Sequence, residues 1–269
     1  MRIQHNIMAM NANRNLTMNN TALSKNLEKL SSGYRINRAG DDAAGLAISE
    51  SMRADVAIYK QSINNANDGI SLVQTAEGAL TEVHSMLNRL ETLATQAASG
   101  TYSGADRTKI GNEVTELKGE ITRIAQSTKF NGITLLDSTL TKCDIQVGQG
   151  QTISAAIFQD CTASGLGVDA VNLGSSTTAA TAMGTIKTAI DTVSGVRAKL
   201  GATQNRLEHT VNNLGVTMEN LQNAESTIRD TNIADEMMKY TKNNILIQSA
   251  QAMLAQANQV PQGVLQLMQ

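Results

Sequence analysis

A heptad repeat between residues 66 and 97 constrains the fold of this chain more than any other feature of its sequence. Two positions of the repeat carry only apolar or small residues: Ala66, Val73, Leu80, Leu87 and Ala94 at the first, and Gly69, Ala76, Val83, Leu90 and Ala97 at the second. Such a sustained seam is typical of a long helix that packs lengthwise against other helices. One helix cannot bury its own apolar stripe, so the remaining chain must supply partner helices.

A second seam follows the same seven-residue spacing from Val193 to Ile228. Between the two seams, apolar residues at spacings of four and three predict a shorter return helix. We therefore expect a rod domain over residues 43–232, with helices over 43–98, 104–129 and 186–232. These helices imply a mainly α fold, an elongated antiparallel helical coiled-coil bundle. The residues expected to pack its helices together are Val73, Leu80, Leu87, Leu200, Leu207, Leu214 and Leu221.

The apolar period changes from helical to alternating after Asn131-Gly132, a dipeptide typical of a tight hairpin turn. A GQGQ turn at residues 148–151 separates two further alternating runs. These patterns predict a small β-hairpin region over residues 130–170 at the tip of the bundle. Residues 172–185 are rich in Ser, Thr, Ala and Gly, and we expect them to form a short variable loop.

Both ends of the chain, residues 1–42 and 233–269, carry an apolar stripe among many polar residues. The residues expected to drive self-assembly are Ile3, Ile7, Leu16, Leu23, Leu27, Leu30, Leu246, Ala250, Met253, Ala257 and Val260. Ordering one end costs about 1–2 kcal/mol per residue, and about ten buried side chains at roughly 1.5–3 kcal/mol each do not offset that cost. We therefore predict that both ends are disordered in the monomer and form an inner-core coiled coil only among other subunits.

The stretch SSGYRINRAGDDAAG at residues 31–45 interrupts the helical pattern with glycines and charged residues. Two interpretations of this stretch remain open. It could be a polar connector whose ion pairs are solvated and contribute little to stability. It could instead be a specific hinge between the terminal helix and the rod.

Composition supports rods over a globule and excludes several partners. Only 2% of the residues are aromatic and the chain has one proline, so large core anchors are few and long helices are uninterrupted. A net charge of -2 gives no basic field for nucleic acid. No apolar run approaches the roughly 18 residues that span a membrane, and no secretory signal peptide is visible. Taken alone, these features would predict a cytoplasmic protein.

Residues that could carry catalysis or hold a metal are isolated in this sequence. His5, His84 and His209 have no carboxylate or cysteine at ligand spacing, and no catalytic or phosphate-binding motif is present. We expect no enzyme, no cofactor and no metal. A two-residue hairpin turn would place Cys143 opposite Ala156, with Cys161 about 16 Å further along the strand. We therefore expect free, partly buried thiols, although a strand that bends back would leave a disulfide open.

Five stretches of the chain resemble bacterial flagellin, in the order in which that family has them. They are NIMAMNANRNL at 6–16, LEKLSSGYRINRAGDDAAGLAISESMRA at 27–54, FNGITLL at 130–136, SGVRAKLGATQNRLEHTVNNL at 194–214 and LAQANQVPQGVLQLMQ at 254–269. The resemblance covers nearly the whole chain. Larger flagellins insert outer domains where this chain has only residues 172–186, so the resemblance implies a short form.

The resemblance implies a structural subunit that polymerises into the extracellular flagellar filament for swimming. It implies export by the flagellar type III apparatus, which explains the missing signal peptide, and partners that include an export chaperone, the filament cap and hook-junction proteins. It also implies recognition of the free monomer by the vertebrate flagellin-sensing toll-like receptor, through Arg89, Leu93 and Glu113. Because Glu91 and Thr92 depart from strongly recognised members, we expect binding with weakened signalling.

Three rival interpretations follow from the same residues. A hook–filament junction protein shares the terminal helices, but it would not polymerise into long tubes. A flagellin-like protease would need an HExxH motif in its variable segment, which is short here and lacks one. A free-standing coiled-coil adaptor would not explain why both ends repeat filament motifs.

Overall fold

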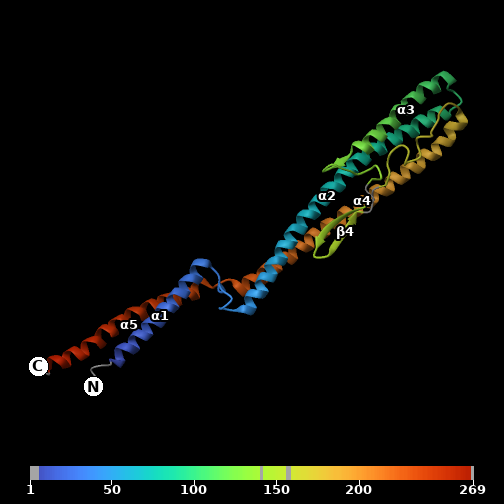
Figure 1. Ribbon diagram of the computed structural model, residues 1–269. Helices are drawn as coiled ribbons and strands as arrows, with labels where there is room; N and C mark the ends of the chain where they lie inside the picture. Colours follow the sequence, from blue (N-terminus) through green and yellow to red (C-terminus); the bar gives the residue numbers. More distant parts are fainter. Residues whose placement is uncertain (1–5, 140–141, 156–158, 268–269) are drawn as a thin grey trace. The chain divides into compact units, whose positions relative to one another are not determined.

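The computed structural model describes residues 6–139, 142–155 and 159–267. Within them the chain forms helices α1 (Ile7–Ser32), α2 (Ala43–Ala98), α3 (Gly104–Ser127), α4 (Ser176–Arg229) and α5 (Ile233–Leu267). Four short strands follow α3, namely β1 (Lys129–Phe130), β2 (Ile133–Thr134), β3 (Cys143–Gly148) and β4 (Gln151–Ala155). The fold is therefore mainly α with a small antiparallel β region, as expected (Figure 1).

The chain divides into two compact units. The terminal unit comprises Met1–Val56 with Glu219–Gln269, and the central unit comprises Ala57–Met218. The expected rod over residues 43–232 therefore reaches into both units, and its boundaries remain a prediction. No helix within the described ranges is long and apolar enough to cross a membrane.

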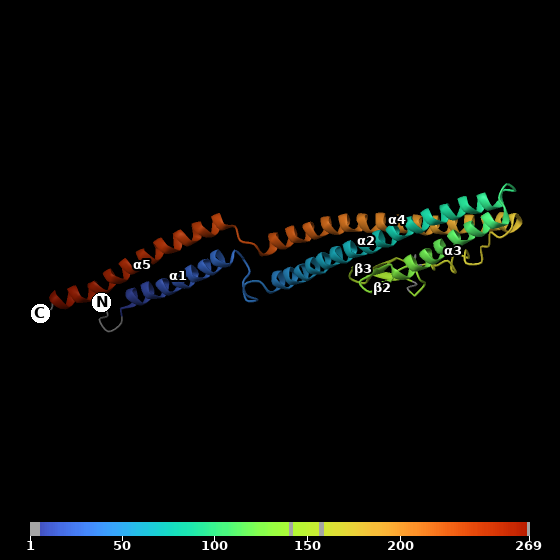
Figure 2. The same cartoon turned by 90° about the horizontal axis from the view of Figure 1, so that it is seen from above.

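In the central unit, α2 and α4 lie side by side and α3 folds back along them (Figure 2). Val73, Leu80 and Leu87 of α2 and Leu200 and Leu207 of α4 are almost completely buried, because the heptad places them at the helix contacts. Leu214 is also buried, whereas Leu221 belongs to the terminal unit and is half-buried. Six of the seven residues predicted to pack the helices are therefore buried.

The α2–α3 turn is fixed by capping groups. Ser103 Oγ accepts a hydrogen bond from the Asp106 amide at 3.3 Å and donates to the Asp106 carboxylate at 2.7 Å. Arg107 donates to the carbonyls of Ala97 and Ser99, which satisfies the open end of α2. These bonds hold α3 in place as the return helix.

The expected loop over residues 172–185 is wrong for most of its length, because α4 already begins at Ser176. Ser175 caps this helix by accepting a hydrogen bond from the Thr178 amide at 3.2 Å. Ala179 and Ala182 are then buried in the core of the central unit. Their small side chains let the helix approach its neighbours closely, which offsets the poor helix propensity of the threonines.

Three helix ends differ by a few residues from expectation. α3 ends at Ser127 rather than residue 129, because Thr128 adopts an extended backbone that leads into β1. α4 ends at Arg229 rather than residue 232, because Asp230 forms an antiparallel β-bridge with Tyr34. α1 continues to Ser32, where Gly33 closes it in a left-handed conformation.

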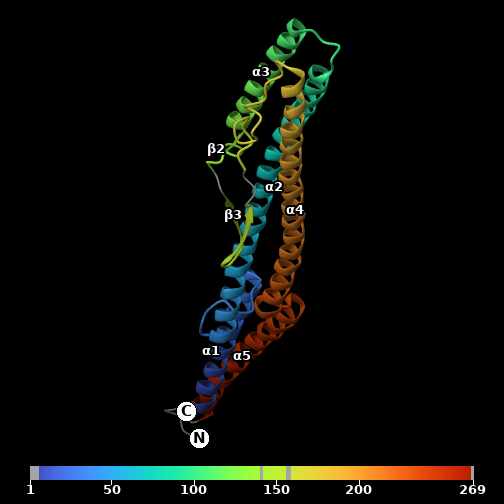
Figure 3. The same ribbon diagram turned by 90° about the vertical axis from the view of Figure 1, so that its right-hand side faces the viewer.

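The β region confirms the expected turns but not the expected register. Asn131 and Gly132 both have positive φ, as a tight hairpin turn requires. β3 pairs with β4 so that Cys143 faces Ala155 rather than Ala156, because a bulge between Gln146 and Gly148 displaces the pairing by one residue. The β3–β4 hairpin lies along α2 (Figure 3), where its apolar side chains pack against Ala66, Leu207 and Leu214.

Both cysteines are free thiols. Cys143 is half-buried on β3, and Cys161 is completely buried in the core of the central unit. Burial, with a smaller effect from the nearby Asp160 carboxylate, raises the pKa of the Cys161 thiol to about 11. Burial likewise raises the pKa of the Cys143 thiol.

The connector between α1 and α2 is bonded to the end of α4 within the terminal unit. The Arg35 amide donates to the Arg229 carbonyl at 2.7 Å, and the Thr231 amide donates to the Gly33 carbonyl at 3.0 Å. The Arg229 guanidinium lies 4.7 Å from the centre of the Tyr34 ring and forms a 2.7 Å ion pair with Glu50. These contacts favour the interpretation of the connector as a specific structure over a solvated linker.

Candidate self-assembly surface

The terminal unit exposes most of the large apolar side chains that the described residues leave in solvent. Twelve of the sixteen lie on α1 or α5. We name this set the terminal apolar surface: Ile7, Met8, Met10, Met18, Leu27, Ile233, Met237, Met238, Ile245, Leu246, Met253 and Val260. Large exposed apolar areas of this kind mark interaction sites in soluble proteins.

Six of these twelve side chains are methionines. Methionine is unbranched and polarizable, so it adapts to partner surfaces of different shape. Met253 is the clearest case on α5, with 67% of its surface exposed. The composition of the terminal apolar surface therefore suits contacts with more than one neighbouring helix.

Beneath this surface, α1 and α5 pack against each other as an antiparallel pair, with the two chain ends at the same end of the pair (Figure 1). At that end, Asn6 Nδ2 donates to the Ala257 carbonyl at 2.8 Å. Each helix turns buried or half-buried residues toward the other at heptad spacing. We name these residues the terminal seam: Ala9, Ala12, Leu16, Asn19, Leu23, Asn26 and Leu30 on α1, and Glu236, Tyr240, Asn243, Ile247, Ala250, Leu254 and Ala257 on α5.

The residues predicted to drive self-assembly separate into two groups. Those in the terminal seam are Leu16, Leu23, Leu30, Ala250 and Ala257. Those exposed on the terminal apolar surface are Ile7, Leu27, Leu246, Met253 and Val260. Ile3 lies outside the described residues.

The sequence stripe on α5 was therefore a mixture of two faces. Leu246, Met253 and Val260 repeat every seven residues on an exposed face, whereas Ile247 belongs to the seam and was missed. The sequence signal for the seam is the seven-residue spacing of Ala250 and Ala257, which extends backwards to Asn243 and Glu236. These two positions are polar, so a search for apolar residues alone passes over them.

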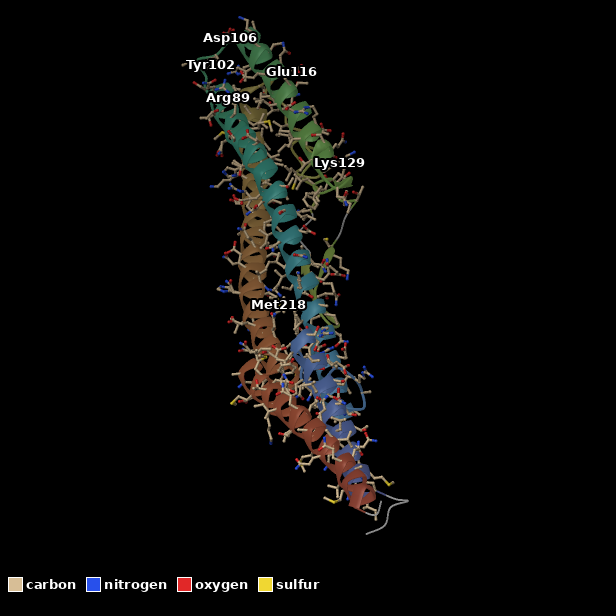
Figure 4. The ribbon with its side chains drawn as sticks, turned by 90° about the vertical axis from the view of Figure 1, so that its left-hand side faces the viewer. Arg89, Tyr102, Asp106, Glu116, Lys129 and Met218 are labelled. Carbon is tan, nitrogen blue, oxygen red and sulfur yellow. The ribbon has the colours of Figure 1, made fainter. Side chains whose placement is uncertain are left out.

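The predicted receptor residues lie on α2 and α3 in the central unit. Arg89 Nη2 forms a 2.7 Å ion pair with Glu113 Oε1, and both side chains are about half exposed. Figure 4 shows Arg89 on α2 together with Asp106 and Glu116 on α3, all on the outside of these helices. The structure thus brings Arg89 and Glu113 together across the two helices.

Leu93, the third predicted receptor residue, is only 2% exposed and belongs to the core of the central unit. Its side chain packs among buried residues of α2, α3 and α4. As a direct apolar contact for a partner, the assignment of Leu93 is wrong. Leu93 instead contributes to the apolar core of the central unit.

The described residues contain no group of three or more His, Cys, Asp or Glu side chains that could hold a metal ion. His84 and His209 lie on α2 and α4, and His5 lies outside the described residues.

Comparisons with known proteins identify one family over most of the chain. The family model for the bacterial flagellin N-terminal helical region matches residues 3–141, and that for the C-terminal helical region matches residues 183–268. A flagellin of Halalkalibacterium halodurans is 50% identical over an alignment of 269 positions that covers 99% of each chain. A flagellin of Bacillus subtilis is 47% identical over 304 residues and covers 100% of each chain.

A solved structure is also similar. The crystal structure of Bacillus cereus flagellin has 35% sequence identity and a TM-score of 0.51, and the match covers 56% of this chain and 88% of that one. The two family models together leave out residues 142–182, which contain the β3–β4 hairpin and the start of α4. The matched regions contain all of α1 and α5, the helices that carry the terminal apolar surface.

Proposed function

Because this chain belongs to the bacterial flagellin family and is a structural subunit of the flagellar filament, we propose that its terminal apolar surface is where copies of the chain pack together. The observation that carries the proposal is the concentration of exposed large apolar side chains on α1 and α5. Full burial of one such side chain between subunits would stabilise the filament by about 1.5–3 kcal/mol relative to leaving the side chain in water.

We further propose that the terminal helix pair is stable only among neighbouring subunits. Towards the chain ends, the seam consists largely of alanines, namely Ala9, Ala12, Ala250 and Ala257. An alanine methyl buries little apolar area, whereas ordering each residue costs about 1–2 kcal/mol. Neighbouring subunits would supply the missing burial by covering the terminal apolar surface.

Ends that order late would also suit export. We propose that the chain leaves the cell through the flagellar type III apparatus, without a cleaved signal peptide, and reaches the extracellular filament. Its partners before and during assembly would be an export chaperone, the filament cap and the hook-junction proteins. Two features support this proposal: membership of the flagellin family, and terminal helices that leave apolar side chains open to a protecting partner.

For the free monomer we propose recognition by the vertebrate flagellin-sensing toll-like receptor at Arg89 and Glu113. Their half-exposed side chains are presented together across α2 and α3, and Glu91 and Thr92 beside them are the reason to expect weak signalling. Substitution Arg89→Ala should weaken binding of the purified monomer to the receptor ectodomain, measured by surface plasmon resonance. The matched control is Arg123→Ala, which removes another exposed α3 ion pair, with Glu120. Equal binding by both variants and the unchanged chain would show that the patch is wrongly placed.

Seeded polymerisation tests the main proposal. Purified full-length chain is added to filament seeds beside a chain that ends at Asn232, and growth is followed by electron microscopy. We expect long tubes from the full chain and none from the shortened one, which lacks α5. Equal growth of the two would refute the assignment of the assembly surface to α5. Short caps on the seeds would instead indicate a junction protein, an alternative that the comparisons do not favour.

A further inference from the structure

A cluster of polar side chains lies inside the terminal seam, close to the connectors. Glu236 is only 3% exposed and Asn26 only 8%. The Asn26 side-chain amide is oriented so that its nitrogen faces two acceptors. Asn26 Nδ2 donates to Glu236 Oε1 at 2.9 Å and to the Ala22 carbonyl at 3.1 Å, and Asn26 Oδ1 accepts from Asn243 Nδ2 at 3.0 Å. The second carboxylate oxygen of Glu236 accepts from Lys239 Nζ at 3.0 Å.

The cluster occupies seam positions that a coiled coil normally fills with apolar residues. Glu236 and Asn243 are one heptad apart on α5, and Asn26 meets both from α1. A buried polar residue at such a position lowers stability but specifies the register and the partner of a helix. A buried carboxylate without its partners is strongly disfavoured, so pairings that separate Glu236 from Asn26 are penalised.

Towards the chain ends the seam carries little information about register, because Ala9, Ala12, Ala250 and Ala257 lie there and an alanine fits against almost any neighbouring position. The connector bond between Gly33 and Thr231 holds the base of the pair within one chain. It does not prevent helices of different copies from pairing wrongly when many of them meet in a growing filament.

We propose that Asn26, Glu236 and Asn243 are the specificity-determining residues of the terminal helix pair. They select the antiparallel pairing of α1 with α5 in one register and disfavour slipped pairs and pairs of α5 with α5. This inference rests on the role of the two helices in self-assembly. It assigns the three residues to selecting the pairing, and the terminal apolar surface to binding other subunits.

Engineered cysteine pairs report the register directly, in a background in which Cys143 and Cys161 are replaced by serine. The pair Asn6→Cys with Ala257→Cys lies where Asn6 contacts Ala257 in the native register. The pair Asn13→Cys with Ala257→Cys would meet only after a slip of one heptad. A short bifunctional thiol reagent is applied to monomer and to seeded filaments, and gels separate links within one chain from links between chains.

The decisive variant is the triple substitution Asn26→Leu, Glu236→Leu and Asn243→Leu, which makes the cluster apolar without leaving a buried charge. In seeded filaments of the unchanged chain we expect the native link to exceed the slipped link by about a hundredfold or more, since a misplaced Glu236 would be buried without its partners. In the triple variant the two links should become comparable, and filament growth should slow although helix content is kept.

Two further variants separate specificity from a simple loss of polar groups. Glu236→Gln keeps a side-chain oxygen that can accept a hydrogen bond from the Asn26 amide, so it should retain the native link. Asn19→Leu changes the seam asparagine one heptad before Asn26 and should also leave the link native. Slipped links in Asn19→Leu would show that any asparagine in the seam sets register, which contradicts the assignment to the Glu236 cluster.

The proposal is overturned if the triple variant forms only the native link. This holds whether its filaments grow normally or fail to grow, because in either case the cluster does not choose the register. The function itself is tested separately by the unchanged chain in the same experiment. If that chain extends the seeds while the triple variant keeps the native link, only the specificity proposal fails.

Discussion

Truncation of one exposed methionine should weaken filament assembly without weakening the subunit. Met253 projects from α5 with 67% of its surface in solvent, on the terminal apolar surface that we propose contacts other copies of the chain. Full burial of a methionine contributes about 1.5–3 kcal/mol, so covering this exposed part contributes about 1–2 kcal/mol. Met253→Ala should therefore raise the critical concentration for filament growth by about 5- to 30-fold.

The assay is seeded growth over a series of monomer concentrations, with the soluble fraction measured after sedimentation. Alanine favours helix at least as well as methionine, so a loss of helix in α5 would not explain the effect. Val216→Ala is the matched control, since Val216 is 60% exposed but lies on α4 in the central unit. A critical concentration within twofold of the unchanged chain would refute the assignment of Met253 to a subunit contact.

Three further predictions concern the folded chain. Leu87→Ala empties a completely buried position of the α2 seam and should cost about 2–5 kcal/mol in the free energy of unfolding, measured by denaturant titration of circular dichroism; a loss below 1 kcal/mol would contradict the packing. At pH 8 a thiol with a pKa of about 11 is ionised in only about one molecule in a thousand. Cys161 should therefore resist iodoacetamide until the protein is unfolded, and the less buried Cys143 should react before Cys161. Arg229→Ala removes the contacts of the guanidinium with Tyr34 and Glu50. Hydrogen exchange at the Arg35 amide should then become at least tenfold faster, while amides at the α2–α4 contact stay protected. Unchanged exchange at Arg35 would show that the hydrogen bond between Arg35 and the Arg229 carbonyl does not depend on the guanidinium.

The sequence predicted the central helices well because their seam is apolar at nearly every heptad position. The expected helix over residues 43–98 and the observed α2 have the same bounds, and Val73, Leu80 and Leu87 are all in the core. An uninterrupted apolar repeat identifies at least one face of each helix that must be buried. The hairpin turn at Asn131-Gly132 was equally readable, since its positive φ values select those residue types.

The errors arose where tertiary contacts override local pattern. The start of α4 looks like a loop because threonines and glycine favour other structures, but burial of Ala179 and Ala182 makes it helical. Leu93 was assigned to a partner because its position matches the apolar contact of the family's receptor patch, whereas the structure buries its side chain in the core of the central unit. A bulge near Val147 cannot be read from alternation, so the register of Cys143 was displaced by one residue.

The terminal helices show why their assembly residues were only partly predictable. A helix that packs against one partner carries one periodic apolar stripe. The apolar residues of α5 instead lie on two faces, one in the terminal seam against α1 and one on the terminal apolar surface. Inside, the polar cluster and the alanines give α1 a specific but weak partner in α5. Outside, methionines and aliphatic residues offer a larger and more adaptable apolar surface. A seam filled with leucine would stabilise the pair in the monomer and reduce its dependence on neighbours. The weak seam instead links the ordering of the helices to the burial of their outer surface, so that folding of the chain ends and addition of a subunit become one step.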